Sequence, residues 1–219
     1  MNELNIDAPV EDWEAVTGLI LAGGRGSRMG GIDKGLQNFH GQPLALHALK
    51  RLQIQRDRQG QPLAEVMINA NRNLTTYESF GAPVWPDTLD GYAGPLAGFM
   101  TGLAHCATPL LLTVPCDTPL FALDLLQRMH TALHHERADL AMAAACEEDG
   151  QLRAQPVFCL MRVTLLPSLI TFTQQGGRKI DAWTALHRTV LVPFNAASDK
   201  PQAFFNANTA AQLHSLENA

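Results

Sequence analysis

Residues 19–36 read LILAGGRGSRMGGIDKGL, an apolar run that opens into a glycine-rich loop and ends on the pair Asp33 and Lys34. A short apolar run that breaks into glycine is typical of a buried strand followed by a loop. Glycines permit a close backbone approach and let successive N–H groups point at an anion, while Arg25, Arg28 and Lys34 add positive charge. The segment therefore predicts a strand that delivers an anion-binding loop to the edge of a sheet.

The rest of the chain alternates short apolar runs with longer segments of helical period, which predicts an α/β sheet with crossover helices. The runs are continuous, as in strands covered on both faces. The predicted strands lie within 19–21, 66–68, 110–114, 140–145, 157–160 and 190–192, with a short one near Val84, and the predicted helices within 43–55, 94–106 and 120–134. Thr209 and Gln212 have the capping-box spacing for a terminal helix. We expect a flexible leader over residues 1–15 and a single domain over 16–219.

Bulk properties restrict the class of protein. The chain has 219 residues, 46% hydrophobic and 17% charged, which fits one globular domain with a sizeable core. Its net charge of -5 argues against a nucleic-acid-binding protein. The four cysteines are widely spaced, so we expect reduced thiols in a cytoplasmic protein. No apolar stretch approaches the roughly 20 residues that span a bilayer. His130 and His134 are four residues apart but lack an H-E-x-x-H context, so we expect them on a solvated helix face.

The glycine loop does not fit the two best known phosphate-binding motifs. Its glycines are spaced one residue too far apart for G-x-G-x-x-G, and Asn69 stands where that motif expects an acidic residue. A P-loop has glycine directly before its lysine and Ser or Thr directly after, whereas Lys34 lies between Asp33 and Gly35. The remaining interpretations are an anion-binding loop of another kind and a surface loop with incidental basic residues.

Asp117 ends the most apolar predicted strand, between Pro115 and Pro119. Because ligands of open α/β sheets bind beyond the carboxyl ends of the strands, Asp117 and the opening loop are expected to lie close together. Magnesium is usually held by one or two carboxylates with water and substrate phosphates, so Asp117 is the predicted metal ligand. Its alternative role is to cap a helix that begins near Pro119. Asp87, which follows Pro86, is either a site residue or a turn residue.

These motifs together resemble the molybdenum cofactor guanylyltransferases, within the larger group of nucleotide-sugar-type nucleotidyltransferases. The matching segments, in the family's order, are Leu21 to Lys34, Ile68 to Asn71, Asp87, Gly94 to Gly98, Pro115 to Pro119, Gln155-Pro156 and Phe205 to Thr209. The resemblance covers nearly the whole chain from Thr17 onward and departs at Ala210, where the family usually has proline. It implies a Rossmann-like three-layer α/β/α fold with a mostly parallel central sheet.

The resemblance implies that GMP is transferred from GTP to the terminal phosphate of molybdopterin carrying molybdenum, with release of pyrophosphate. Arg28, Lys34 and Asp117 are then the catalytic residues, and Asp117 holds the implied cofactor Mg²⁺. The implied GTP-binding residues are Leu21, Ala22, Gly23, Gly24, Lys34, Asn69, Asp87 and Asp117.

For the acceptor, the segment 176–179, GGRK, offers a flexible turn with two cations suited to a phosphate. Its alternative role is a helix-to-helix connection with solvated basic residues. The amide side chains of Gln155, Asn206 and Asn208 are suited to hydrogen bonds with polar edges of the pterin. The predicted acceptor-binding residues are Gln155, Arg178, Lys179, Asn206 and Asn208.

The identity of the base rests on the resemblance alone. Relatives that use CTP tend to carry Ala-Ala-Gly where this chain has Ala22-Gly23-Gly24, and the missing side chain at Gly23 is interpreted as room for guanine. The alternatives are a cytidylyltransferase on the same pterin, a nucleotidyltransferase on another phosphorylated acceptor and a non-catalytic nucleotide-binding regulatory domain. The resemblance also implies transient contacts with molybdenum-insertion proteins and with molybdoenzymes or their chaperones. We expect a cytoplasmic monomer that binds neither nucleic acid nor membrane.

Overall fold

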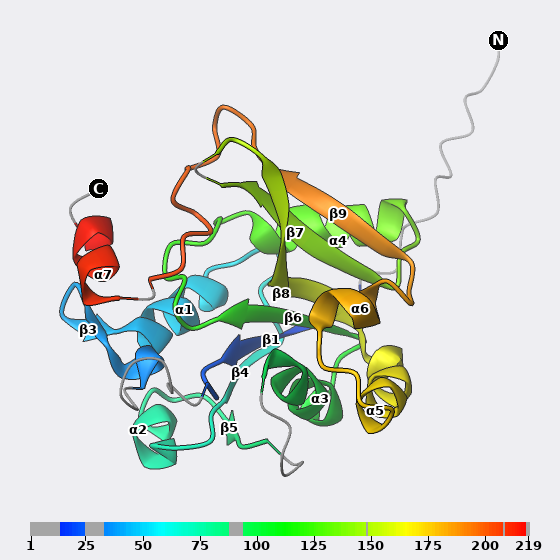
Figure 1. The fold of residues 1–219 in the computed structure, drawn as a ribbon, viewed down its shortest axis with the longest axis horizontal. Helices are drawn as coiled ribbons and strands as arrows, with labels where there is room; N and C mark the ends of the chain where they lie inside the picture. Colours follow the sequence, from blue (N-terminus) through cyan, green and yellow to red (C-terminus); the bar gives the residue numbers. More distant parts are fainter. Residues whose placement is uncertain (1–13, 25–32, 88–93, 148, 208, 218–219) are drawn as a thin grey trace.

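A computed structural model describes residues 14–24, 33–87, 94–147, 149–207 and 209–217 (Figure 1). The predicted site residues Arg28 and Asn208 lie outside these ranges. The main sheet has seven strands in the order β5-β4-β1-β6-β8-β7-β9. They are β1 (Val16–Leu21), β4 (Glu65–Asn69), β5 (Val84–Trp85), β6 (Leu110–Pro115), β7 (Leu140–Cys146), β8 (Leu152–Arg162) and β9 (Thr189–Phe194). A small second sheet pairs β2 (Asn38–Phe39) with β3 (Gln42–Pro43).

The main sheet is mostly parallel, as predicted. Strands β5, β4, β1 and β6 run in one direction, and β9 runs parallel to β7. Strand β8 is antiparallel to both of its neighbours, β6 and β7. Its direction follows from the short connection after β7, because a tight turn joins only antiparallel strands whereas a parallel pair needs a longer crossover.

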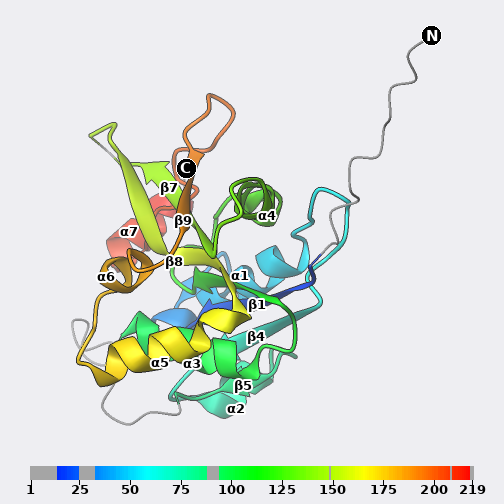
Figure 2. The same ribbon diagram turned by 90° about the vertical axis from the view of Figure 1, so that its right-hand side faces the viewer.

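Helices cover both faces of this sheet (Figure 2). One face packs against α1 (Leu44–Gln53) and α4 (Leu125–His135), and the other against α3 (Pro95–His105), α5 (Leu166–Gln174) and α6 (Ile180–Thr184). Consecutive strand residues serve different faces: Ile20 packs with the first group and Leu19 with the second. Both are fully buried, which explains why the apolar runs are continuous. The predicted three-layer α/β/α fold is confirmed.

Helix α4 begins at Leu125, later than the sequence predicts. The side chain of Gln55, fully buried, donates to the carbonyl oxygen of Ala122 and accepts from the backbone N–H of Leu126, both at 3.0 Å. These contacts hold the preceding segment out of the helix. No helix therefore begins near Pro119, and the alternative role of Asp117 as a helix cap is wrong.

The C-terminal helix α7 (Ala210–Glu217) returns to the N-terminal half of the chain. The Thr209 hydroxyl accepts a hydrogen bond from the backbone N–H of Gln212 at 3.1 Å, so the predicted cap is confirmed. Leu213 and Leu216 pack with Phe39 of β2 in a small separate core. Helix α7 is thereby fixed beside the segment that follows Lys34.

Glu14 is anchored at the opposite end of the sheet, although the sequence analysis placed it in a flexible leader. It forms an ion pair with Arg162 at 2.8 Å and lies 3.5 Å from the ring of His134. His130, 3.1 Å from His134, is only 7% exposed, so its predicted place on a solvated face is wrong. The pKa of His130 is lowered to about 4, mainly by burial and secondly by the charge of the neighbouring His134. None of the helices in the described ranges has the length and apolarity that a membrane crossing requires.

Candidate active site

Strands β1, β4 and β6 end side by side at one edge of the sheet (Figure 1). Leu21 is in register with Asn69 on one side and Pro115 on the other. The pairing continues one residue further, because the backbone N–H of Ala22 donates to the Asn69 carbonyl at 2.8 Å and that of Cys116 donates to Leu21 at 3.2 Å. The loops that carry the predicted site residues therefore leave the same edge.

Lys34 and Asp117 meet at this edge, as the strand-end argument predicts. The Lys34 Nζ atom lies 3.4 Å from Asp117 Oδ2, although the two residues are 83 positions apart in the chain. Lys34 begins the short 3-10 helix η2 (Lys34–Leu36), and Asp117 is the second residue after the end of β6. Their side chains are 31% and 18% exposed, so both charges remain accessible to a ligand. The pair places one cation and one anion where a phosphate and a metal ion are expected to bind.

Asn206 lies beside the loop after β6 that contains Asp117 (residues 116–119), which we call the Asp117 loop. The Thr118 hydroxyl donates to the Asn206 side-chain oxygen, and the backbone N–H of Ala207 donates to the Asp117 carbonyl at 2.9 Å. Thr118 is fully buried. A late segment of the chain therefore forms one wall of the site next to Asp117.

Asp87 is held by two asparagines, Asn69 at the end of β4 and Asn71 just after it. Its carboxylate accepts from the Asn69 amide at 2.9 Å and from the Asn71 amide at 2.8 Å, and its own backbone N–H donates to Asn71 at 2.7 Å. The Asn71 amide also donates to the Gly23 carbonyl at 3.2 Å. This network ties the end of β5 to the start of the glycine-rich loop, so Asp87 does more than complete a turn.

Gly23 is a glycine because its neighbours leave no room for a side chain. A Cβ atom there would lie 2.8 Å from Asn71 Nδ2 and 3.0 Å from Asn69 Oδ1. The amides of Asn69 and Asn71 therefore lie directly against the Gly23 backbone. Asn69 itself is 2% exposed, and its amide group donates to both Trp85 and Asp87. The geometry makes Asn69 a support for Asp87.

The sequence analysis did not assign Asp33 or Asn71 to the site. Asp33 caps the 3-10 turn at Lys34 by accepting from the Gly35 backbone N–H at 3.2 Å. An aspartate directly before a helical turn is a recognisable capping signal. Asn71 belongs to a polar segment that follows a strand end, and that position alone marks it as a candidate.

The predicted acceptor residues are spread more widely. Gln155 lies within β8. The last residue pair between β6 and β8 is Thr113 with Cys159, and the part of β8 that contains Gln155 extends from this pair beyond the carboxyl end of β6. The turn with Arg178 and Lys179 connects α5 to α6, on the side toward which β1 runs (Figure 2). This turn is therefore a helix-to-helix connection with exposed basic residues.

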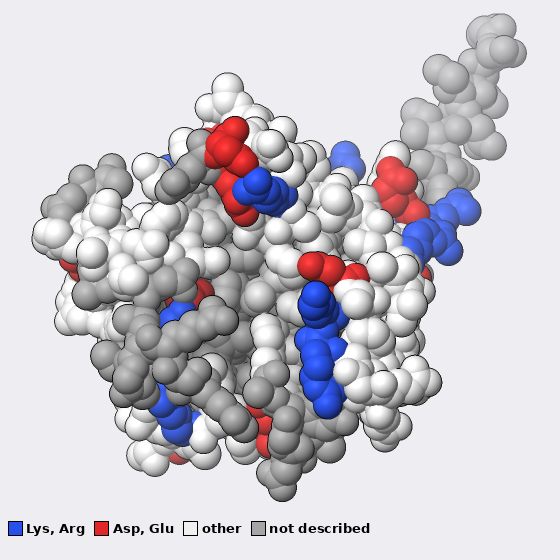
Figure 3. All heavy atoms as spheres, viewed as in Figure 1, with Lys and Arg blue, Asp and Glu red and all other residues white. Residues whose placement is uncertain are grey.

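Arg178 also has a structural contact in this turn. Its guanidinium donates to the carbonyl of Thr173 at 3.1 Å and to that of Gly177 at 2.9 Å, which satisfies the carboxyl end of α5. Figure 3 shows basic side chains gathered beside the hollow in the middle of the same face of the molecule. The face suits an anionic ligand despite the net negative charge of the chain.

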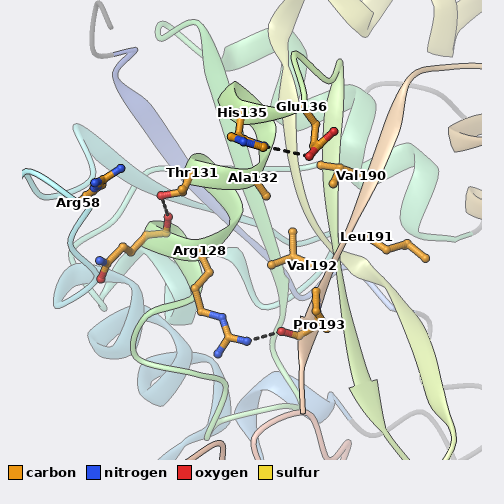
Figure 4. Close-up of a pocket in the computed structure, with 11 residues that line it drawn as sticks. Arg58, Arg128, Thr131, Ala132, His135, Glu136, Val190, Leu191, Val192 and Pro193 are labelled. Carbon is orange, nitrogen blue, oxygen red and sulfur yellow. Dashed lines mark hydrogen bonds and ion pairs between the residues drawn. The ribbon is translucent and has the colours of Figure 1, made fainter. Parts of the chain in front are cut away.

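A groove of about 620 Å³ lies elsewhere, between α4 and the edge strand β9 (Figure 4). It is lined by Arg58, Gln127, Arg128, Thr131, Ala132, His135, Glu136 and residues 190–193. None of the predicted site residues lines it. The chemistry-bearing residues lie at the carboxyl edge of the sheet, and we place the site there.

In the described ranges, no three His, Cys, Asp or Glu side chains gather closely enough to form a metal-binding group. Asp117 offers a single carboxylate at the edge of the sheet. This donor set fits Mg²⁺, which takes oxygen ligands and completes its shell with water and substrate phosphates. It does not fit zinc, which favours several nitrogen or sulfur ligands from the protein.

Comparisons with known proteins agree with this geometry. Residues 18–190 match the family model of the MobA-like NTP transferase domain. The chain is 65% identical over 214 residues to a molybdenum cofactor guanylyltransferase of Albidiferax ferrireducens, covering 96% of this chain and 98% of the relative. It is 64% identical to the protein of the same name in Acidovorax sp. strain JS42, covering 94% and 97%. The solved structure of molybdopterin-guanine dinucleotide biosynthesis protein A from Archaeoglobus fulgidus has the same fold, with a TM-score of 0.71 at 19% identity and coverage of 92% and 97%.

Proposed function

The chain belongs to the MobA-like NTP transferase family, among the molybdenum cofactor guanylyltransferases, and from this premise we propose that it forms the guanine dinucleotide of the molybdenum cofactor. The reaction transfers GMP from GTP to the terminal phosphate of Mo-molybdopterin and releases pyrophosphate. The observation that carries the proposal is the Lys34–Asp117 pair, 3.4 Å apart at the carboxyl edge of a nucleotidyltransferase sheet.

The chemistry requires little beyond alignment and charge neutralisation. An oxygen of the acceptor phosphate attacks the α-phosphorus of GTP, a new O–P bond forms, and the bond to the β-phosphate oxygen breaks with pyrophosphate as the leaving group. Two anions must approach in line, so positioned cations and N–H donors lower the barrier without a covalent nucleophile. Lys34 supplies a cation at the phosphates, and the backbone from Leu21 to Gly24 approaches them from the end of β1. Arg28 is proposed as a second cation.

Asp117 is the proposed ligand of Mg²⁺. A magnesium ion held by Asp117 would supply positive charge that offsets the negative charge of the substrate phosphates. Asp117 lies at the end of β6, and Lys34 lies next to it, so the two side chains flank the proposed position of the phosphates.

The nucleoside end of GTP is assigned to the neighbouring strand ends. Asp87 is rigidly presented there by the amides of Asn69 and Asn71. A carboxylate fixed in this way is suited to accept hydrogen bonds from a nucleoside. We assign Asp87 to direct contact and Asn69 to the support of Asp87, since Asn69 is almost fully buried.

The acceptor is assigned to the second half of the chain. Asn206 lies against the Asp117 loop through Thr118, and Gln155 lies on the strand that passes the end of β6. Lys179, exposed in the turn before α6, is proposed to attract the pterin phosphate. Arg178 and Asn208 complete the proposed acceptor set. Further parts of the proposal are a cytoplasmic, monomeric enzyme and transient contacts with molybdenum-insertion proteins and with molybdoenzymes or their chaperones.

The test is pyrophosphate release by the purified chain with GTP, MgCl₂ and Mo-molybdopterin. We expect release that requires all three components, and we expect CTP to support much slower turnover. Faster turnover with CTP would identify a cytidylyltransferase. GTP binding without any pyrophosphate release would favour a regulatory nucleotide-binding domain, and release with another phosphorylated acceptor would change the assigned substrate.

A further inference from the structure

Asp33, directly before Lys34, is a nearly buried carboxylate with several donors. Its Oδ1 atom accepts from the Tyr77 hydroxyl at 2.7 Å, and its Oδ2 atom accepts from the Asn73 amide at 2.9 Å. The Asp33 side chain is 8% exposed, and Tyr77 is fully buried. Asn73 precedes the helix α2 (Leu74–Glu78), and Tyr77 lies within it, so both donors belong to one rigid segment.

The packing around Gly35 makes this contact specific. A Cβ atom at Gly35 would collide with the Tyr77 hydroxyl, so the backbone on the far side of Lys34 lies directly against the same tyrosine. Burial, followed by the hydrogen bond to Asp33, raises the pKa of Tyr77 well above its usual range. The hydroxyl therefore remains a donor at every pH used in an assay. Lys34 is bracketed by two residues that are both fixed to α2.

Arg72 joins this segment to the other end of the glycine-rich loop. Its guanidinium donates to the Gly24 carbonyl at 3.4 Å and lies 3.6 Å from the Asp33 carboxylate. The segment from Arg72 to Tyr77 thus contacts both Gly24, three residues after β1, and Asp33, next to Lys34. These contacts fix the start of the 3-10 turn relative to the sheet.

We propose that Asp33 is a positioning residue that acts through Lys34, with Tyr77 and Asn73 as its supports. A lysine ammonium is a point charge on a flexible four-carbon stem, so its location depends on how firmly its own backbone is held. Asp33 does not touch the substrate, and its effect on the reaction is transmitted by the place of Lys34 beside Asp117. The inference rests on the proposed function.

The test is a double-mutant cycle on the magnesium-dependent release of pyrophosphate. Asp33→Asn keeps the size of the side chain and weakens its bonds to Tyr77 and Gly35. We expect it to lower kcat roughly 10-fold to 100-fold, since displacements of about 1 Å have such effects. In a Lys34→Ala background, Asp33→Asn should change kcat by less than about twofold, because residues that act as a unit are not additive. Tyr77→Phe is the milder second variant and should show the same pattern.

Asp57→Asn is the matched control. Asp57 is also a nearly buried aspartate, 4% exposed, that accepts two backbone N–H groups in a turn, those of Gln59 and Gln61, but it lies in the α1–β4 connection. It should lower the melting temperature and leave kcat within about twofold of wild type, as a structural cap does. The inference is wrong if Asp33→Asn behaves like this control, or if it lowers kcat equally in both backgrounds. A wild-type chain that releases no pyrophosphate would instead refute the proposed function.

Discussion

Replacing Gly98 by alanine should damage the nucleoside end of the site from within helix α3. A Cβ atom at Gly98 would lie 2.5 Å from Leu21 Cδ2 and 2.7 Å from Asn69 Oδ1. The contacted Leu21 atom is the end of a flexible side chain, whereas Asn69 is held by its bonds to Trp85 and Asp87. The substitution therefore pushes on the residue that supports Asp87.

The size of the effect follows from these distances. Ordinary contact begins near 3.4 Å, so Asn69 or the helix must move by about 0.7 Å. Alanine gains about 1 kcal/mol of helix propensity over glycine, and overpacking a core costs about 1–3 kcal/mol. The net destabilisation is about 0–2 kcal/mol, a fall in Tm of up to about 8 °C for a chain of this size. Because a shift near 1 Å costs up to about 100-fold in rate, we expect turnover to fall by roughly 10-fold or more.

Gly102→Ala, one helical turn later, is the control for this prediction. Its Cβ would collide with Leu19 and lie 3.0 Å from Leu111, both apolar side chains away from the site. Both variants should lower Tm by similar amounts, measured by calorimetry, and only Gly98→Ala should reduce pyrophosphate release and weaken GTP binding. Wild-type turnover in Gly98→Ala, or an equal loss in Gly102→Ala, would refute the role of Asn69 as a support for Asp87.

The remaining predictions concern charge. Asp117→Asn should lower turnover by roughly 100-fold or more, and near-normal magnesium-dependent turnover would remove the metal assignment. Charge reversal at Arg178 and Lys179 should raise the KM for the pterin and leave GTP binding intact. Lys179→Glu is the cleaner variant because Arg178 also binds the end of α5. An unchanged KM would contradict the acceptor assignment. Stability to urea should fall as the pH drops from about 6.5 toward 4. In this range His130 binds a proton in the unfolded chain but not in the folded chain, where its pKa is about 4. His130→Phe should flatten this dependence, and an unaltered profile would show that other groups cause it.

The location of the main-sheet strands along the chain could be predicted because their signal is local. Leu19 and Ile20 are adjacent and both apolar, as expected for a strand covered on both faces. Because ligands of open α/β sheets bind beyond the carboxyl ends of the strands, the sequence also predicted that Lys34 and Asp117 lie close together. Periodicity and topology were sufficient for these two conclusions.

The errors arise where a tertiary contact overrides a local pattern. The start of α4 depends on Gln55, more than sixty residues earlier in the chain, whose hydrogen bonds are invisible in the helical period. The burial of His130 involves Glu14, which is more than a hundred residues earlier in the chain and lies 3.5 Å from the neighbouring His134.

The arrangement of the edge also indicates where the two substrates meet. Lys34, proposed to bind the nucleotide, lies at the start of η2, and Asn206, proposed to bind the acceptor, lies in the segment before α7. Both contact the same short loop, Lys34 through Asp117 and Asn206 through Thr118. In-line transfer requires the acceptor phosphate and the α-phosphate of GTP to approach within bonding range. Because residues of this loop contact both Lys34 and Asn206, we propose that the transferred phosphate lies beside it, where a metal ion held by Asp117 would offset the charge of both substrates.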